Sequence, residues 1–313
     1  MTSRLARWRT LGALVAVVAL GAAVAAAWAA LPRVDWEQMR AAPGAGGWLV
    51  WAALAFIVAQ VFAARLWVAF VRLFAQVGRV RREAGLWLLS QLGKYVPGNV
   101  AGLALRAWHS EARPAAVAAA FLSEAVAHVA VSSLVGAGVL VVTSGEQIGV
   151  ALGALVGIAV VLAARRPVLR ALDRLLVRLG RSPLGLADRP LSDLGPVAAG
   201  TLLYWILSGG AFALFCYGLG YQLAPVRTAA WFVLAWCAGF LAVPIPGGLG
   251  VREAVLVSGL ASSMGAPAAI LVAVGYRAWS TILDVAVAGV GSALALGAPA
   301  VRSAISAARS RQS

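Results

Sequence analysis

The stretch VPIPGGLGVRE, residues 243–253, interrupts an apolar run that extends over residues 228–266. Proline lacks the backbone N–H that a helix interior needs, and consecutive glycines weaken a helix further, so this stretch predicts two short helices separated by a break. A second apolar run, residues 84–108, contains the stretch GKYVPGNVAG at residues 93–102. The sequence therefore predicts two broken helices.

Composition places both broken helices in a membrane protein. Of the 313 residues, 62% are apolar and 12% are charged, and the mean hydropathy is +0.89. A soluble domain is about half apolar and about a quarter charged, so this chain has too few polar residues to cover a soluble fold. Non-helical backbone at membrane depth is tolerated only where protein buries it or where it lines a wet cavity. The breaks are therefore candidates for a substrate pathway, with ordinary helix kinks as the alternative.

Six other apolar runs are long enough to cross a bilayer, which takes about 20 helical residues. They extend over residues 10–31, 47–70, 115–143, 145–164, 196–217 and 268–296. Together with the two broken or re-entrant segments, they predict an all-α, polytopic membrane helical bundle that forms a single domain over residues 1–313. The first run is alternatively a cleaved signal peptide, although its apolar part is longer than a typical signal core.

The uneven charge of the chain predicts its orientation. The sequence has 26 basic and 11 acidic residues, and a formal net charge of +15. In a membrane protein such an excess marks the cytoplasmic loops, so nucleic acid is not needed to explain it. The basic segments are the N-terminus, residues 71–83, residues 165–193 and the C-terminal tail. We expect both termini to be cytoplasmic, and residues 165–193 to form a basic amphipathic segment that anchors to the cytoplasmic leaflet or recruits anionic lipid.

The order of the spans predicts an inverted repeat. If the basic segments are cytoplasmic, the segment 84–108 has to begin and end inside, and the segment 228–266 has to begin and end outside. A re-entrant hairpin is the simplest solution for the first segment, whereas the second is long enough for a hairpin or for two crossings. One unit, about residues 47–143, then runs opposite to the other, about residues 196–296. Inverted repeats with discontinuous helices are typical of transporters.

Three cations near the breaks are candidates for binding an anion. Arg106 follows the first break, Arg252 follows the second, and Lys94 lies within the first. The N-terminus of a half-helix offers free N–H groups and the positive end of a dipole, and arginine adds bidentate recognition of phosphate or carboxylate. Arg106 and Lys94 are alternatively snorkelling residues. Arg252 lies on the non-cytoplasmic half, where orientation does not require a positive charge.

Other ionisable residues lie inside the predicted spans. Glu124 lies on the span 115–143, and Arg277 and Asp284 lie on the last span. A charge at the bilayer centre costs at least about 2.5–3.5 kcal/mol, so it normally faces a partner or water. We expect Glu124 and Arg277 to belong to the substrate site, with a structural contact between helices as the alternative. Glu253 is a candidate partner for its neighbour Arg252.

The remaining reactive residue types predict no cofactor and no metal. Cys216 and Cys237 lie in apolar runs and lack the spacing of metal ligands. The two histidines, His109 and His128, are too few for a histidine-rich metal site. We expect His128 to make a structural contact with a neighbouring helix.

At its two breaks the sequence resembles the lysylphosphatidylglycerol synthase transmembrane-region family of flippase-like membrane proteins. The stretches GKYVPG (93–98) and PIPGGLGVRE (244–253) carry the resemblance, together with Leu122-Ser123-Glu124 and Tyr276-Arg277. It extends from about residue 47 to residue 296, and Asn99 departs from the family pattern, in which glycine or lysine is common at that position. The resemblance and the charges together predict these substrate-binding residues: Lys94, Tyr95, Pro97, Gly98, Arg106, Glu124, Pro246, Gly247, Gly248, Arg252, Glu253 and Arg277.

The resemblance implies a transporter, and not an enzyme, that moves an anionic phospholipid or a polyprenyl-phosphate-linked lipid between the leaflets of the plasma membrane. In the founding members a separate soluble domain makes the lipid. Only a short Arg/Ser tail follows the last span here, so we expect no synthase activity. The expected partners are membrane lipids with anionic headgroups and, as a candidate, a glycosyltransferase or lipid-modifying enzyme. The alternatives are a membrane-embedded lipid-phosphate transferase and a scaffold for a glycosyltransferase.

Overall fold

The structure, a computed structural model, describes residues 44–95, 100–144, 195–242 and 246–297, with a few isolated positions outside these ranges. Every regular element in these ranges is helical, so the predicted all-α bundle is confirmed. The first half contains α3 (Ala45–Arg72), α4 (Val80–Ser90), the 3₁₀ turn η2 (Gln91–Tyr95), α5 (Val100–His109) and α6 (Pro114–Ser144). The second half contains α8 (Gly195–Gly218), α9 (Pro225–Leu241), η5 (Pro246–Gly248), α10 (Val251–Met264) and α11 (Ala266–Leu296).

Four of these helices are long and apolar enough to cross a membrane. Their membrane-compatible parts are Gly46–Arg72, Pro114–Val142, Gly195–Gly218 and Ala266–Ala295. They coincide with four of the six predicted full spans. The other two predicted spans, 10–31 and 145–164, and most of the predicted basic segment 165–193 lie outside the described residues.

Both broken segments form pairs of short helices, as the proline and glycine residues predict. The first consists of α4 with 11 residues and α5 with 10 residues, and the second of α9 with 17 and α10 with 14. Each is shorter than the roughly 20 residues of a full crossing. The turns η2 and η5, one from each break, contact each other inside the bundle. These lengths and this contact favour a re-entrant hairpin in both halves.

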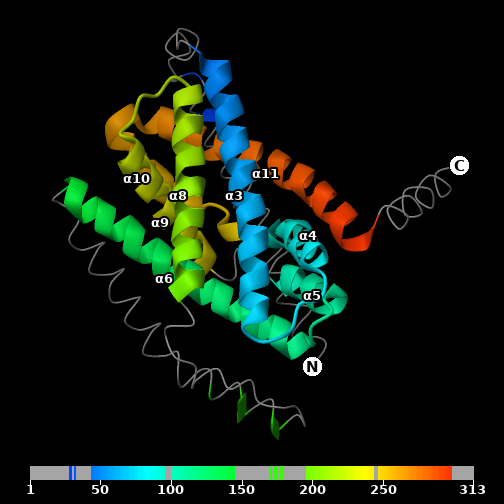
Figure 1. Cartoon of the computed structure of the whole chain (residues 1–313). Helices are drawn as coiled ribbons and strands as arrows, with labels where there is room; N and C mark the ends of the chain where they lie inside the picture. Colours follow the sequence, from blue (N-terminus) through cyan, green and yellow to red (C-terminus); the bar gives the residue numbers. More distant parts are fainter. Residues whose placement is uncertain are drawn as a thin grey trace, which may run out of the picture.

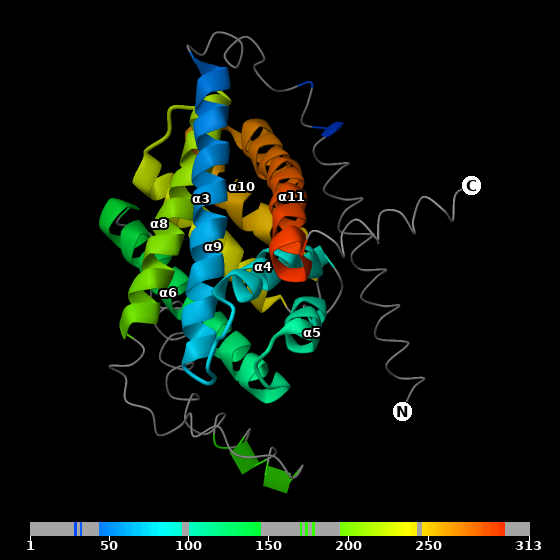
Figure 2. The ribbon, with the colours of Figure 1, turned by 45° about the vertical axis from the view of Figure 1, so that its right-hand side comes forward.

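The two halves pack in a symmetric pattern. The long helices α3 and α8 lie side by side and run in opposite directions (Figures 1 and 2). A two-fold axis that exchanges them would also exchange α4 with α9 and α6 with α11. The contact of α4 with α11 would then correspond to the contact of α6 with α9, and both are among the most extensive in the protein. This packing supports the interpretation of the chain as an inverted repeat.

The apolar core is divided between the halves. One cluster centres on α3, α4 and α6 and includes Trp67, Phe70 and Trp87, whereas the other centres on α8 to α11 and includes Phe212 and Tyr276. The first short helix of each broken segment packs against two long helices: α4 against α3 and α11, and α9 against α6 and α8. This division leaves the polar side chains of both breaks at the boundary between the two clusters.

A pair of touching glycines lies at each break. A side chain on Gly93 would collide with the backbone of Gly102, and one on Gly248 would collide with the backbone of Gly239. The two pairs occupy corresponding positions, since Gly239 and Gly248 follow Gly93 and Gly102 by 146 residues in each case. Both breaks therefore depend on the absence of a Cβ atom where the chain folds back on itself.

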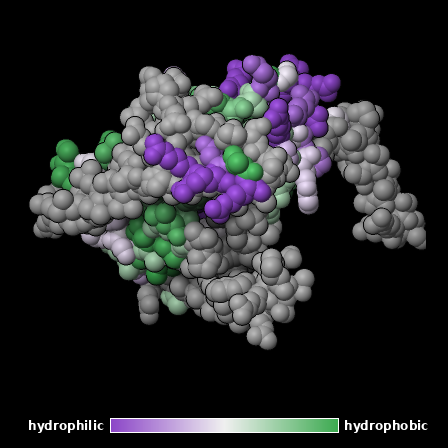
Figure 3. All heavy atoms as spheres, turned by 90° about the horizontal axis from the view of Figure 1, so that it is seen from below, coloured by the Kyte–Doolittle hydropathy of each residue, from purple (hydrophilic) through white to green (hydrophobic). Residues whose placement is uncertain are grey.

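One end of the bundle carries exposed arginines. The connections from α3 to α4 and from α5 to α6 lie at the lower end in Figure 1, and hydrophilic residues gather there when the molecule is seen from below (Figure 3). Arg79 and Arg113 are exposed in these connections, and Arg81 is exposed in the first turn of α4. The arginines of the predicted basic loop 71–83 are thus exposed or partly exposed, as those of a cytoplasmic loop would be.

Replacing Gly248 with alanine should destabilise the protein. The added methyl group would meet the backbone of Gly239, and the φ angle of Gly248 is +64°, which an L-residue rarely adopts. Overpacking of this kind costs about 1–3 kcal/mol. Gly210→Ala is the matched control, because open space lies beside Gly210 in α8. Thermal unfolding in one detergent should give a lower Tm for Gly248→Ala than for Gly210→Ala, and equal values would contradict this packing.

Candidate functional site

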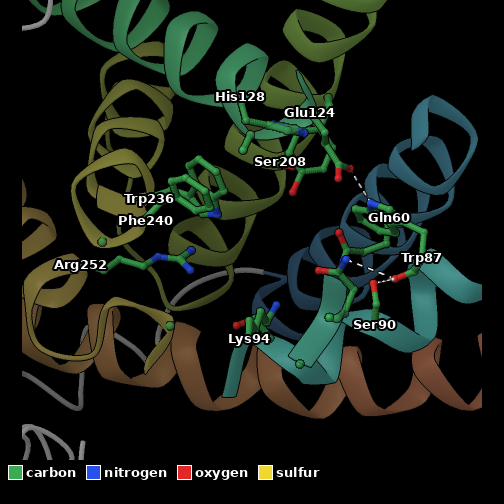
Figure 4. Close-up of a pocket in the computed structure, with 18 of the residues that line it drawn as sticks. Gln60, Trp87, Ser90, Lys94, Glu124, His128, Ser208, Trp236, Phe240 and Arg252 are labelled. Atoms are coloured by element: carbon green, nitrogen blue, oxygen red, sulfur yellow. Dashed lines mark hydrogen bonds between the residues drawn. The ribbon is translucent and has the colours of Figure 1, made fainter. Parts of the chain in front are cut away.

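A cavity of about 200 Å³ lies where the two breaks meet. Side chains from all the described helices from α3 to α11 line it, and so do residues of both 3₁₀ turns. The predicted site residues Lys94, Tyr95, Arg106, Glu124, Gly247, Arg252 and Arg277 are all among its lining residues. Residues distributed over most of the chain thus converge on one interior space, shown in Figure 4.

Arg106 and Glu124 form a buried ion pair on one side of the cavity. The distance from Nη1 of Arg106 to Oε2 of Glu124 is 2.7 Å, and the two residues are 5% and 7% exposed. Nε of Arg106 donates to Oγ of Ser90, and the indole N–H of Trp87 donates to Oε1 of Glu124. The guanidinium also lies 4.4 Å from the ring centre of Trp67. Arg106 is therefore held inside the protein and does not snorkel to the interface.

A second pair, Arg277 with Glu253, lies at the other break. Nη1 of Arg277 is 3.2 Å from Oε1 of Glu253, and Nη2 of Arg277 donates to the carbonyl oxygen of Gly247. The backbone N–H of Gly250 donates to Oε2 of Glu253. Glu253 thus occupies the N-terminus of α10, where free N–H groups were predicted to bind a ligand. Glu253 pairs with Arg277 and not with its neighbour Arg252, so that candidate pair is not formed.

The two ion pairs join corresponding helices of the two halves, with the positions of arginine and glutamate exchanged. In the first half the arginine lies on α5 and the glutamate on α6, and in the second half the glutamate lies on α10 and the arginine on α11. Each pair joins the second short helix of a broken segment to the long helix that follows it. Removal of one partner from such a pair leaves a buried charge, which is far more costly than loss of an exposed pair.

A third pair connects the two halves. Nζ of Lys94, on η2, is 2.6 Å from Oδ2 of Asp284, on α11. Tyr95 donates to the same oxygen, and Nε2 of Gln60 donates to Oδ1. Asp284 is fully buried, which explains why the polar groups around it are all directed at its carboxylate. Lys94 and Tyr95 thereby fix the first break against the last long helix.

Arg252 differs from the other cations of the cavity. Its guanidinium lies 4.9 Å from the ring centre of Phe232, and among the described residues no carboxylate lies within ion-pair distance of it. Figure 4 shows its side chain extending into the open space, on the opposite side from Glu124 and Gln60. Arg252 corresponds to Arg106, since it also follows 146 residues later. One half thus neutralises its arginine and the other leaves it available.

Aromatic residues form the wall beside Arg252. We call Tyr204, Trp205, Trp236 and Phe240 the aromatic wall. Trp236 and Phe240 stack with ring centres 5.1 Å apart, and Trp205 meets Trp236 at 4.7 Å. His128 packs edge-on against this wall, and its Nδ1 has no hydrogen-bond partner among the described residues. The structural role predicted for His128 is therefore an aromatic contact.

The other predicted site residues, Pro246 among them, are not among the described residues that line the cavity. Pro97 and Gly98 lie outside the described residues. Gly248 packs against Gly239 as part of the turn, and Glu253 contributes by holding Arg277. Gln60, Trp87, Asp284 and the aromatic wall belong to the site or its surroundings but were not predicted as site residues. The sequence does contain a signal that the two breaks correspond. Gly93, Gly102 and Arg106 recur with the same spacing as Gly239, Gly248 and Arg252.

The fold and the cavity define a multi-pass membrane protein in which two discontinuous helices meet at a charged interior site. A family model described as the lysylphosphatidylglycerol synthase TM region matches residues 10–288. The chain therefore belongs to this family, as its breaks predicted, and membership indicates a function related to membrane lipids. Comparisons with curated proteins and with solved structures found no match.

Replacing Glu124 with alanine should destabilise the protein by about 3–5 kcal/mol, because it leaves the buried Arg106 guanidinium without a counter-ion. The control is Glu111→Ala, which removes an exposed pair with Arg82 and should cost at most about 1 kcal/mol. The double variant Arg106→Met/Glu124→Leu should recover much of the loss. Thermal unfolding of the unmodified protein and of these three variants compares the costs. Equal effects of the two alanine variants would argue against a buried pair.

Proposed function

We propose that this protein is a flippase-like transporter that moves an anionic phospholipid or a polyprenyl-phosphate-linked lipid between the leaflets. The observation that carries the proposal is Arg252, a guanidinium directed into an interior cavity without a carboxylate partner among the described residues. Leaving a cation unpaired in such a place is costly, and an anionic ligand removes that cost. Phosphate is a good candidate because arginine binds it through two parallel hydrogen bonds.

The charges around the cavity support an anion of low charge. Four cations, Lys94, Arg106, Arg252 and Arg277, lie beside three described acids, Glu124, Glu253 and Asp284. The three acids each pair with one cation, and the positive charge of Arg252 remains. A phosphodiester carries a single negative charge and would balance this excess.

The size of the cavity supports a mechanism in which only the lipid headgroup enters it. At about 200 Å³ it is smaller than the roughly 300–1,000 Å³ that encloses a drug-sized ligand. A lipid could place its headgroup there only if its tails stayed in the bilayer. The cavity lies between two halves that pack as an inverted repeat, the arrangement in which transporters expose one site to either side of a membrane.

We propose further that the protein acts without chemical change to its lipid, in the plasma membrane, with both termini in the cytoplasm. Membrane lipids with anionic headgroups are its proposed partners, and a glycosyltransferase or lipid-modifying enzyme is a proposed protein partner. The exposed arginines at one end of the bundle support this orientation. Mass spectrometry of the labelled lipid recovered after transport tests whether the lipid is unchanged, since a transferase would alter its mass.

Arg252→Gln should reduce transport strongly without loss of folded protein. A hydrogen bond to a charged group contributes about 1.5–3 kcal/mol, which corresponds to roughly 10–150-fold weaker headgroup binding. The measurement is the rate at which a fluorescent anionic phospholipid in proteoliposomes becomes accessible to an external quencher. Arg113→Gln is the control, because Arg113 is exposed at the end of the bundle and does not line the cavity.

Equal transport rates for Arg252→Gln and the unmodified protein would refute the assignment of Arg252. A comparable loss in Arg113→Gln would show that the effect comes from net charge and not from the cavity. Circular dichroism and size-exclusion profiles of each variant separate a loss of binding from a loss of fold.

A further inference from the structure

The three acids near the cavity already pair with cations of the protein. Glu124 accepts from Trp87 on Oε1 and from Arg106 on Oε2. Glu253 accepts from Arg277 on Oε1 and from the backbone of Gly250 on Oε2. Asp284 accepts from Gln60 on Oδ1, and from Tyr95 and Lys94 on Oδ2. Every carboxylate oxygen of these three acids is thus hydrogen-bonded within the protein.

An ammonium group would therefore find no unpaired acid among the described residues near the cavity. The three carboxylates are 7%, 8% and 0% exposed and already face a cation of the protein. A further positive charge would also meet the unpaired guanidinium of Arg252. The rings of the aromatic wall attract cations, but such contacts contribute about 0.5–2 kcal/mol and cannot replace a counter-ion beside four other cations. The cavity thus disfavours headgroups that carry an amine.

The remaining lining suits a neutral ring with hydroxyl groups. Trp236 and Phe240 are partly exposed and lie next to Arg252, so a flat apolar face can pack on them while a phosphate contacts the guanidinium (Figure 4). Neutral polar side chains lie among the further aromatic residues of the lining: Gln60, Ser90, Gln91, Ser208 and Ser280. Sugars and cyclic polyols combine an apolar C–H face with a rim of hydroxyl groups and match both kinds of surface.

We propose that the headgroup bound here is the phosphate ester of a neutral hydroxylated ring, a sugar or cyclic polyol without an amine. The phosphate binds Arg252, and the ring packs on Trp236 and Phe240. This inference rests on the proposed transport function and narrows its substrate. The lipid that carries such a headgroup is either a glycerolipid or a polyprenyl phosphate, since the cavity holds only the shared headgroup.

The test is a panel of tail-labelled lipids in proteoliposomes that contain the full chain. Phosphatidylinositol and a polyprenyl phosphohexose carry the ring, phosphatidic acid carries phosphate alone, and phosphatidylethanolamine carries an ammonium. At least one ring-bearing lipid should move about tenfold faster than phosphatidylethanolamine and also faster than phosphatidic acid. Which of the two ring-bearing lipids moves identifies the source of the headgroup.

Phe240→Leu should lower the rate for the ring-bearing lipid more than it lowers the rate for phosphatidic acid, and so reduce the preference for the ring. Trp108→Leu is the control, because Trp108 is 84% exposed and does not line the cavity. If phosphatidylethanolamine moves as fast as the ring-bearing lipids in the unmodified protein, the inference is wrong while transport stands. If none of the four lipids moves, the proposed transport function itself is refuted for these substrates and the inference with it.

Discussion

The arrangement of this protein depends on the cost of placing charge inside a membrane. A buried ion without a partner is strongly destabilising, so the charged side chains of the two breaks must be paired, hydrogen-bonded or exposed to a polar space. Three ion pairs meet this requirement, and each of them fixes one part of a broken helix against a long helix. Arg252 is the exception among the cavity cations: its guanidinium lies over the ring of Phe232, and no described carboxylate pairs with it. The same constraint that stabilises the bundle thus leaves one position where an anion is favoured.

The glycine pairs make this electrostatic arrangement possible. Gly93 touches Gly102 and Gly239 touches Gly248, so both breaks turn tightly enough to bring their cations to one cavity. The two halves are similar in geometry but not in charge. Arg106 is neutralised by Glu124, whereas its counterpart Arg252 is not neutralised by a described residue. The repeat thus places one paired and one unpaired arginine at corresponding positions of its two halves.

The sequence predicted the breaks well because proline and glycine act locally, and it predicted four described spans because hydropathy sums over many residues. It did not predict the pairing of charges. Arg252 and Glu253 are adjacent, but neighbours on a helix point about 100° apart, so Glu253 reaches Arg277 instead. The partner of Lys94 lies 190 positions away in the other half, and only folding brings Asp284 to it. The aromatic wall was also missed, because apolar rings on a membrane helix have the same pattern whether they face lipid or a cavity.

The most direct test of the central claim is a cryo-electron microscopy map of the protein in nanodiscs of native lipid. The account predicts phosphate density within hydrogen-bond distance of the Arg252 guanidinium, with the lipid tails outside the cavity and the three ion pairs intact. A map in which Arg252 pairs with a carboxylate of the protein, or in which an acyl chain fills the cavity, would contradict it.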